Sequence, residues 1–329
     1  MRSSFREMFK TICLSFVFLL PLATHAKPSG EIIFRHPTEQ RELWIGNLND
    51  EQSARPIFRL PHIITAFSIQ KDGCYIVAVV KIVTDELDVL ATVYDVYLLD
   101  RKHPTAEAKK LTHGEYSEII DADLSPGGDV VFTNHSFVII GKIRERGLYL
   151  ISNHEIKNKK PIAKLLRKDS PYRVDWAPDG KKIAYSTDTG IFLFNTTTKE
   201  VSQITKDGDL PVFSPDSKYL AFRTNTDPHK IGIRPFVGPR HLRYIEPKEG
   251  LSIDALTWSA DGQYLVYTLH NHEPAYTNFA AHIDSERTEQ ILETYSNGGL
   301  AMFDWATRAY ALHPEGLLTT VWGKIKQKK

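Results

Sequence analysis

Histidine is the residue type in this chain that most readily suggests chemistry. His270, His272 and Glu273 stand within four residues, and His282 follows ten residues after His272. Alternate residues of an extended segment lie on one side, so the spacing of His270 and His272 suits a shared metal ion. The same spacing suits solvated or hydrogen-bonded surface histidines, or a pH-sensitive contact with a polar ligand. The residues alone leave these three interpretations open.

A second set of candidates stands near the starts of short apolar segments that precede tight turns. These residues are Asp121, Arg173, Asp175, Asp209 and Asp254. If the segments are strands around one channel, their acidic bias suits a cationic or metal-bridged ligand. Carboxylates scattered around a water-filled channel are the alternative.

The motifs of common enzyme classes do not occur in the sequence. It contains no Gly-x-Ser-x-Gly, no Gly-x-x-x-x-Gly-Lys, no His-Glu-x-x-His and no Cys-x-x-Cys. A lyase whose residues are scattered over several repeats has no such motif, so it stays open as an alternative.

A repeated strand–turn–strand unit must position these residues. In the clearest copies a strand ending in an aromatic residue meets a turn of the type Ser/Ala-Pro-Asp-Gly, and a second apolar strand follows, as in 176–185, 213–222 and 258–267. Weaker copies occupy 124–132 and 69–77. Pro fixes φ at the first corner, Asp bonds back to the backbone, and Gly allows the positive φ that closes the hairpin. We therefore assign the Asp residues of these turns a turn-forming role.

Four short strands per unit predict the fold class. In the best copy the segments 190–194 and 201–205 add a third and a fourth strand, which gives four antiparallel strands in about 45 residues. One such sheet cannot bury both of its faces, so the copies must pack on one another. Radial packing of four-stranded sheets gives a β-propeller, with Trp176, Phe213 and Trp258 in the core between blades. We predict an all-β fold with six blades.

The two ends of the chain are expected to close the ring. Segments 31–34, 41–46 and 57–60 have the pattern of second, third and fourth strands without a first. The C-terminal part offers two candidates for the missing inner strand, 299–305 and 317–322. The sequence does not choose between them, but one composite blade leaves neither end as a long open edge.

The repeat Trp-Ala-Pro-Asp-Gly-Lys-Lys-Ile-Ala-Tyr at 176–185 and its copies closely resemble the repeats of TolB-like, WD-repeat-like propellers. The resemblance covers nearly the whole chain after residue 26 and implies the propeller fold. The N-terminal α/β domain of TolB has no counterpart here, because the first predicted strand begins at Glu31. Partner contacts that depend on that domain are therefore not expected.

The propeller geometry predicts where the candidate residues lie. The loop around His270 and His272 falls between the second and third strands of a blade, and His135 and His229 fall in the equivalent loops of two others. These loops share a face with the starts of the inner strands. We predict that His270, His272 and His282 lie on this ligand-binding face but hold no tightly bound metal, because firm zinc sites need three or four oriented ligands.

The N-terminus predicts export. Arg2, Arg6 and Lys10 precede an apolar run at 12–22, and Thr-His-Ala at 24–26 suits signal peptidase. We expect cleavage after Ala26, a single propeller domain at 27–329, and a periplasmic or secreted monomer without membrane insertion. Cys74 then remains without a partner for a disulfide and is expected to be a small buried hydrophobe.

Composition bounds the partners. Removal of the signal takes away three basic residues and one acidic residue and leaves 38 Lys and Arg against 39 Asp and Glu. This balance provides no general attraction to nucleic acid. We predict a non-enzymatic binding or scaffold protein of the bacterial cell envelope that docks a protein or peptide partner and needs no cofactor. The alternative is a polysaccharide lyase of the oligogalacturonate-lyase type, with a histidine-bound divalent metal at the ligand face.

Overall fold

The computed structural model describes most of the chain after residue 27. It covers residues 28–70, 72–86, 89–135, 144–238, 241–247, 252–270, 276–285, 287–292 and 300–306, and of residues 84–86 and 89–91 the backbone alone. The predicted signal segment and the candidate strand at 317–322 lie outside these ranges. No helix within them is long and apolar enough to cross a membrane.

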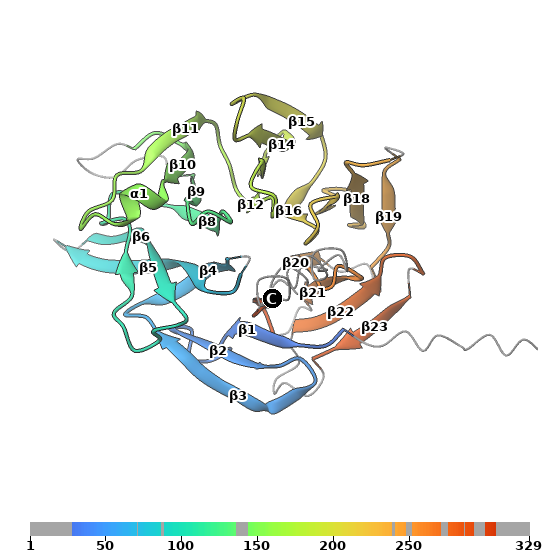
Figure 1. Cartoon of the computed structure of the whole chain (residues 1–329), viewed down its shortest axis with the longest axis horizontal. Coiled ribbons are helices and arrows are strands. Elements are labelled where there is room, and N and C mark those ends of the chain that lie inside the picture. Colours follow the sequence, from blue (N-terminus) through green and yellow to red (C-terminus); the bar gives the residue numbers. More distant parts are fainter. Residues whose placement is uncertain are drawn as a thin grey trace, which may run out of the picture.

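Six four-stranded antiparallel sheets are arranged as blades around a central axis (Figure 1). The prediction of a six-bladed β-propeller is therefore confirmed. We number the blades in chain order from the first complete one. Within each blade the strands are named in order from the innermost, at the axis, to the outermost, at the rim.

Blades 1 to 3 follow one another along the chain. Blade 1 consists of β4 (Ile63–Ile69), β5 (Tyr75–Glu86), β6 (Val89–Asp100) and β7 (Lys109–Lys110). Blade 2 consists of β8 (Ile119–Leu124), β9 (Val130–Asn134), β10 (Gly147–Ile151) and β11 (Lys164–Lys168), with the short helix α1 (Asn153–Ile156) before β11. Blade 3 consists of β12 (Val174–Trp176), β13 (Lys182–Thr187), β14 (Gly190–Asn195) and β15 (Val201–Thr205).

Blades 4 to 6 complete the ring. Blade 4 consists of β16 (Asp209–Phe213), β17 (Tyr219–Arg223), β18 (Ile231–Pro235) and β19 (Arg243–Ile245). Blade 5 consists of β20 (Ser252–Trp258), β21 (Tyr264–His270), β22 (Tyr276–His282) and β23 (Thr288–Ile291). Blade 6 consists of β24 (Phe303–Trp305), β1 (Glu31–Arg35), β2 (Glu42–Asn47) and β3 (Asp50–Arg59).

Blade 6 joins the two ends of the chain, as predicted. Its inner strand β24 pairs with β1 through Ile33 and Asp304, so the first of the two candidate segments forms this strand. The Ala306 N–H donates to the Glu31 carbonyl at 2.9 Å and extends the pairing. Arg101 of blade 1 donates to the carbonyls of Ala306 and Gly73 and holds the end of β24 from the neighbouring blade.

Burial of both faces of the blades explains the apolar runs in the sequence. On β1, Ile32 and Phe34 pack with residues of blade 5 such as Val266, whereas Ile33 packs with residues of blade 1 such as Ile76. All five are at most 2% exposed. Alternate residues of one strand thus serve two different interfaces between blades.

The turns between first and second strands have the predicted chemistry. The turn carboxylates of Asp179, Asp216 and Asp261 each accept the N–H two residues later, at 2.8 to 3.0 Å. The third turn residues have positive φ in all five copies: Gly73, Gly128, Gly180, Ser217 and Gly262. The turn-forming role of the Asp residues is confirmed.

The predicted aromatic core positions are also confirmed. Trp176, Phe213 and Trp258 are at most 5% exposed, and the Trp258 indole donates to the Val212 carbonyl of the preceding blade at 3.1 Å. The expectation for Cys74 was wrong, because this residue ends the turn before β5 and its side chain is partly exposed.

Candidate functional site

The propeller has two faces with different components. The inner strands start at one end of the ring, which we call the entry face, together with the loops between second and third strands. The turns between first and second strands lie at the other end, which we call the turn face. In blade 5, for example, Ser252 and His270 pair at the entry face, whereas Trp258 and Leu265 pair near the turn face.

A central cavity of about 190 Å³ runs between the six inner strands. Each inner strand contributes to its wall, and four of the five candidate residues near strand starts line it: Asp121, Arg173, Asp175 and Asp254. Asp304 of β24 is a further carboxylate in this wall. The wall of the cavity therefore carries one cationic side chain, that of Arg173, and four carboxylates.

Two carboxylates of β8 support the interface between blades 2 and 3. Asp121 Oδ2 accepts the Val174 N–H at 3.2 Å, and Asp123 Oδ2 accepts the Trp176 N–H at 2.5 Å. Inner strands are edge strands, so their axial N–H groups need acceptors from outside their own sheet. The carboxylates of β8 provide these acceptors for β12.

The same arrangement recurs farther around the ring. Asp175 Oδ2 accepts the Phe213 N–H of blade 4 at 2.7 Å, and Asp175 is 6% exposed. Asp304 Oδ1 accepts the N–H of the next residue, Trp305, at 2.8 Å. It also accepts the Thr257 hydroxyl of blade 5 at 3.3 Å. Asp175 and Asp304 are thus engaged within the protein, and their positions are explained by the contacts between blades.

Asp121 combines this contact with an unusual ionisation. Burial raises the pKa of its carboxyl group to about 6, although the nearby Arg173 lowers it and the N–H groups of Val174 and Ala122 lower it further. Desolvation opposes the charged form and exceeds the effect of these three partners. Asp121 therefore titrates close to neutral pH.

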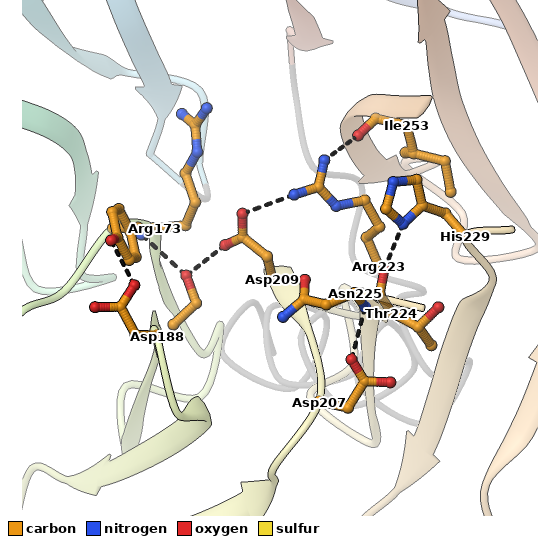
Figure 2. A network of polar contacts seen from close by, with 11 residues as sticks. Arg173, Asp188, Asp207, Asp209, Arg223, Thr224, Asn225, His229 and Ile253 are labelled. Atoms are coloured by element: carbon orange, nitrogen blue, oxygen red, sulfur yellow. Dashed lines mark hydrogen bonds and ion pairs between the residues drawn. The ribbon is translucent and has the colours of Figure 1, made fainter. Parts of the chain in front are cut away.

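Arg173 is the candidate whose charged group is least engaged. Its backbone N–H donates to the Ser186 hydroxyl at 3.2 Å. Figure 2 shows its guanidinium directed away from that contact, and no hydrogen bond joins the guanidinium to another described residue. Arg173 is therefore available to a ligand at the cavity.

Asp209 takes part in a different contact from the one predicted. Figure 2 shows its carboxylate directed at Arg223 of its own blade, and the other carboxylate oxygen accepts the hydroxyl of Ser186 of blade 3. The two distances are 2.5 Å to the Ser186 hydroxyl and 3.0 Å to Arg223 Nη2. Arg223 Nη1 continues to the Ile253 carbonyl of blade 5 at 2.7 Å. Asp209 does not belong to the cavity wall but is part of a network that joins three blades.

A second arginine has the same function at the ring closure. Arg35 ends β1 as Arg223 ends β17, and its Nη1 donates to the Ile64 carbonyl of blade 1 at 2.9 Å. Burial lowers the pKa of Arg35. In both cases an arginine at the end of a second strand binds the start of the next inner strand.

The histidines of blades 2 and 4 lie on the entry face, in the predicted loops. His135 stacks on Tyr172 with ring centroids 4.3 Å apart, and the Tyr172 hydroxyl donates to Asp188 at 2.6 Å. This hydrogen bond raises the pKa of the Tyr172 phenol. His229 Nδ1 lies 2.8 Å from the Thr224 carbonyl, a contact in which the histidine donates.

His270 ends β21 on the entry face. Its Nδ1 lies 3.5 Å from Asp254 Oδ2, and its ring stacks on Tyr276 with centroids 5.1 Å apart. Both side chains of the pair are accessible, with 47% of His270 and 37% of Asp254 exposed. His272, two residues later, lies outside the described residues.

The prediction for His282 was wrong. It ends β22 and pairs with Tyr264 at the turn face, while His270 pairs with Tyr276 at the other end of the same two strands. Six residues of strand separate the two ends, roughly 20 Å. His282 is 8% exposed, and its Nδ1 accepts the N–H groups of Asp284 and Ser285. It therefore cannot share a ligand with His270.

Groups of three or more His, Cys, Asp or Glu side chains that suit a metal ion do not occur among the described residues. The residues that the sequence did not single out are Asp123, Asp304, Arg35 and Arg223. A partial signal existed, because Asp123, Asp175 and Asp304 each precede the large residue that ends an inner strand.

No protein-family model matches the chain, and no curated protein matches it. Solved structures with a similar fold include TolB from Acinetobacter baumannii, which is 18% identical with a TM-score of 0.62 over 84% of this chain and 67% of that chain. A TolB-type protein from Agrobacterium tumefaciens is 18% identical with a TM-score of 0.52 over 80% of this chain and 88% of that chain.

A structure of the nidogen/laminin complex also matches, with 9% identity and a TM-score of 0.62 over 85% of this chain and 99% of that chain. At these identities the comparisons establish the fold. The ring of six four-stranded blades closed by β24 is thus a β-propeller similar to the propeller of TolB.

Proposed function

We propose that this chain is a non-enzymatic binding protein of the bacterial cell envelope whose entry face docks a protein or peptide partner. The observation that carries the proposal is the mouth of the central cavity. Arg173 lines it with a guanidinium that bonds no other described residue, and the half-exposed pair of Asp254 and His270 lies nearby.

The charged residues of the cavity wall differ in whether they are bonded within the protein. Asp175 and Asp304 stabilise contacts between blades, whereas Arg173 and Asp254 present charge at the wall of the cavity. Charged groups at the centre of a docking surface fix the orientation of a partner and exclude wrong ones. Among the fold neighbours, one structure is itself a complex of two proteins, nidogen and laminin.

A charge reversal on each face tests the proposal. Immobilised protein is incubated with envelope extract, and retained proteins are identified by mass spectrometry and then titrated in purified form. We expect Arg173→Glu to weaken binding of the specific partner by at least tenfold. The matched control is Lys181→Glu, which makes the same change of charge at an exposed residue of the turn face.

The two variants also show how the proposal fails. Equal binding by wild type, Arg173→Glu and Lys181→Glu would place the docking surface elsewhere. If purified proteins from the extract bind none of the three, the binding function itself is wrong.

A further inference from the structure

The segment of blade 2 from the end of α1 to the end of β11 carries a concentrated positive charge. Residues 157–168 contain six Lys and Arg residues and no Asp or Glu, whereas the chain after residue 26 is balanced in charge. Only Lys168 among the six forms an ion pair with a described residue, Glu145, at 3.0 Å. All six are exposed: Lys157, Lys159, Lys160, Lys164, Arg167 and Lys168. We call residues 157–164 the basic loop.

The basic loop is anchored to blade 2 on the turn face, where β10 ends beside the start of β9. The Asn153 N–H donates to Asp129 Oδ1 at 2.7 Å, and the Asn153 side-chain amide donates to the Gly127 carbonyl at 2.7 Å. Ile156 is 7% exposed and packs in the core between blades 1 and 2. These contacts fix the chain directly before the loop, so its lysines extend from a defined position.

The carboxylate directly before the basic loop binds other groups. Glu155 Oε2 accepts the side-chain N–H of Asn158 at 3.0 Å and the backbone N–H of Ile162 at 3.4 Å. No carboxylate among the described residues forms an ion pair with the four lysines of the loop. The positive charge of these lysines is therefore available to a partner.

An apolar pocket of about 400 Å³ lies on the same face, between blades 2 and 3. Its apolar wall is formed by Leu150 and Leu166 of blade 2 and by Trp176, Ile183 and Phe194 of blade 3. Binding sites for small molecules have volumes of roughly 300–1,000 Å³ and mostly apolar walls. The pocket therefore has room for one large apolar side chain.

Lysines from both blades flank this pocket. On blade 2, Lys164 is the strand partner of Leu150, so both residues lie on the side of the blade that packs toward blade 3. On blade 3, Lys199 lines the pocket, and its Nζ lies 5.8 Å from the centroid of the Phe194 ring. The Lys199 ammonium donates to the Thr196 carbonyl and keeps further donors for a ligand. The outer end of the pocket is thus positively charged.

The carboxylates of the pocket lie at its other end. Asp129 and Asp179 belong to the turns between first and second strands, which are nearer the axis than Lys164 and Lys199. One oxygen of each carboxylate accepts a backbone N–H, at 2.7 and 2.8 Å. This distribution of charge orients an anionic ligand, whose carboxylates must point toward the rim.

We propose that the pocket and the basic loop bind an acidic segment of a partner protein. One large apolar side chain of this segment enters the pocket, and the carboxylates that follow it pair with the lysines. Charge complementarity selects this occupant. Residues 307–329 of the chain itself do not suit the site, because they contain five Lys and Arg residues and one Glu. A flat anionic membrane would pair with the lysines but would leave the recessed pocket unfilled.

The test uses the peptide acetyl-Leu-Phe-Asp-Glu-Asp-Glu-amide as the probe and the full chain as the receptor, with calorimetric titration. We expect saturable binding that Lys164→Glu weakens about fivefold or more, because the change replaces an attraction by a repulsion. The matched control is Lys102→Glu, a charge reversal at an exposed residue in the equivalent loop of blade 1. It is expected to leave binding unchanged.

The peptide itself separates charge from apolar burial. Replacement of its Phe by Ala, or of its acidic residues by Asn and Gln, should each weaken binding severalfold. The indole N–H resonance of Trp176 should shift when the peptide binds, since Trp176 is part of the pocket wall.

Four results would overturn the proposal. Wild type that does not bind the peptide contradicts the site, and equal losses in Lys164→Glu and Lys102→Glu contradict its location. Binding that is insensitive to the change of Phe to Ala contradicts the role of the pocket. Phosphatidylglycerol vesicles that bind wild type and displace the peptide would make a lipid surface the occupant. None of these variants alters the entry face, so the proposed function is tested separately.

Discussion

At the scale of single residues, the carboxylates of the cavity wall have different roles that the residue type alone does not reveal. Asp175 is 6% exposed and binds the backbone of blade 4, whereas Asp254 is accessible and faces His270. The same side chain therefore stabilises the fold at one position and is available to a ligand at the other. Stability and binding measurements should separate these roles.

Removal of the Asp175 carboxylate should destabilise the protein. In Asp175→Ala the buried N–H of Phe213 loses its acceptor, which costs about 1–3 kcal/mol of unfolding free energy. Asp175→Asn keeps an oxygen acceptor and should lose less. Asp254→Ala is the control and is expected to change stability by about 0.5 kcal/mol or less. Urea denaturation measures all three, and an Asp175→Ala protein as stable as wild type would contradict the assignment.

The raised pKa of Asp121 makes stability depend on pH. Its folded-state value of about 6 lies above the roughly 3.9 of an unfolded aspartate, so the folded state holds the proton more tightly. This contribution is fully present below the unfolded pKa and is lost as the pH rises through 6. One pKa unit corresponds to about 1.36 kcal/mol, so the loss is at most about 3 kcal/mol.

Asp121→Asn isolates this effect from the other carboxylates. The amide is neutral at all pH values, so the variant should gain stability relative to wild type between pH 4 and pH 7.5, by about 1–3 kcal/mol. Groups with lowered pKa, such as Asp216, act in the opposite direction in both proteins and cancel in the difference. A stability difference that does not change with pH would show that Asp121 is not buried as described.

At the scale of elements, Arg101 is the side chain that connects blade 1 to the closing strand. It donates to the carbonyls of Gly73 and Ala306, and its burial lowers its pKa. Arg101→Met should cost about 1.5–3 kcal/mol, the range for hydrogen bonds to charged groups. Arg59→Met is the control, because Arg59 is 64% exposed and its surface pair with Glu42 is expected to contribute about 1 kcal/mol or less.

Hydrogen exchange should locate the effect of Arg101→Met. The amides of β24 should exchange faster in this variant and stay unchanged in Arg59→Met. Equal exchange in both variants would mean that β24 is held by its pairing with β1 alone.

The elements that sequence predicts well are those encoded by neighbouring residues. Asp179 and Gly180 specify their turn within a few positions, so turns, strands and blade number were predictable. The contacts of Asp175 with Phe213 connect residues of different blades and depend on how the blades sit in the ring. His282 was misplaced because the sequence does not show that β22 continues as a strand to this residue. The length of the hairpin formed by β5 and β6 was missed for a similar reason.

At the scale of the whole molecule, ring closure should determine stability. Deleting residues 27–48 removes β1 and β2, leaves β24 without a partner and exposes the apolar faces of blades 1 and 5. We expect a marked fall in melting temperature or loss of soluble expression. A protein that starts at residue 28 is the control and should melt like the full chain. A deletion variant as stable as this control would contradict closure by blade 6.

The pairing of β1 with β24 has a consequence for synthesis. Ile33 and Asp304 are opposite each other in the sheet but stand near opposite ends of the chain. At roughly 5–20 residues per second, translation delivers the second partner roughly 14–54 s after the first. During this interval the edge of β1 that β24 occupies is unpaired, and for most of it blade 5 is not yet there to cover Ile32 and Phe34. Closure of the ring by blade 6 thus makes β1 the strand that waits longest for its second neighbour during synthesis.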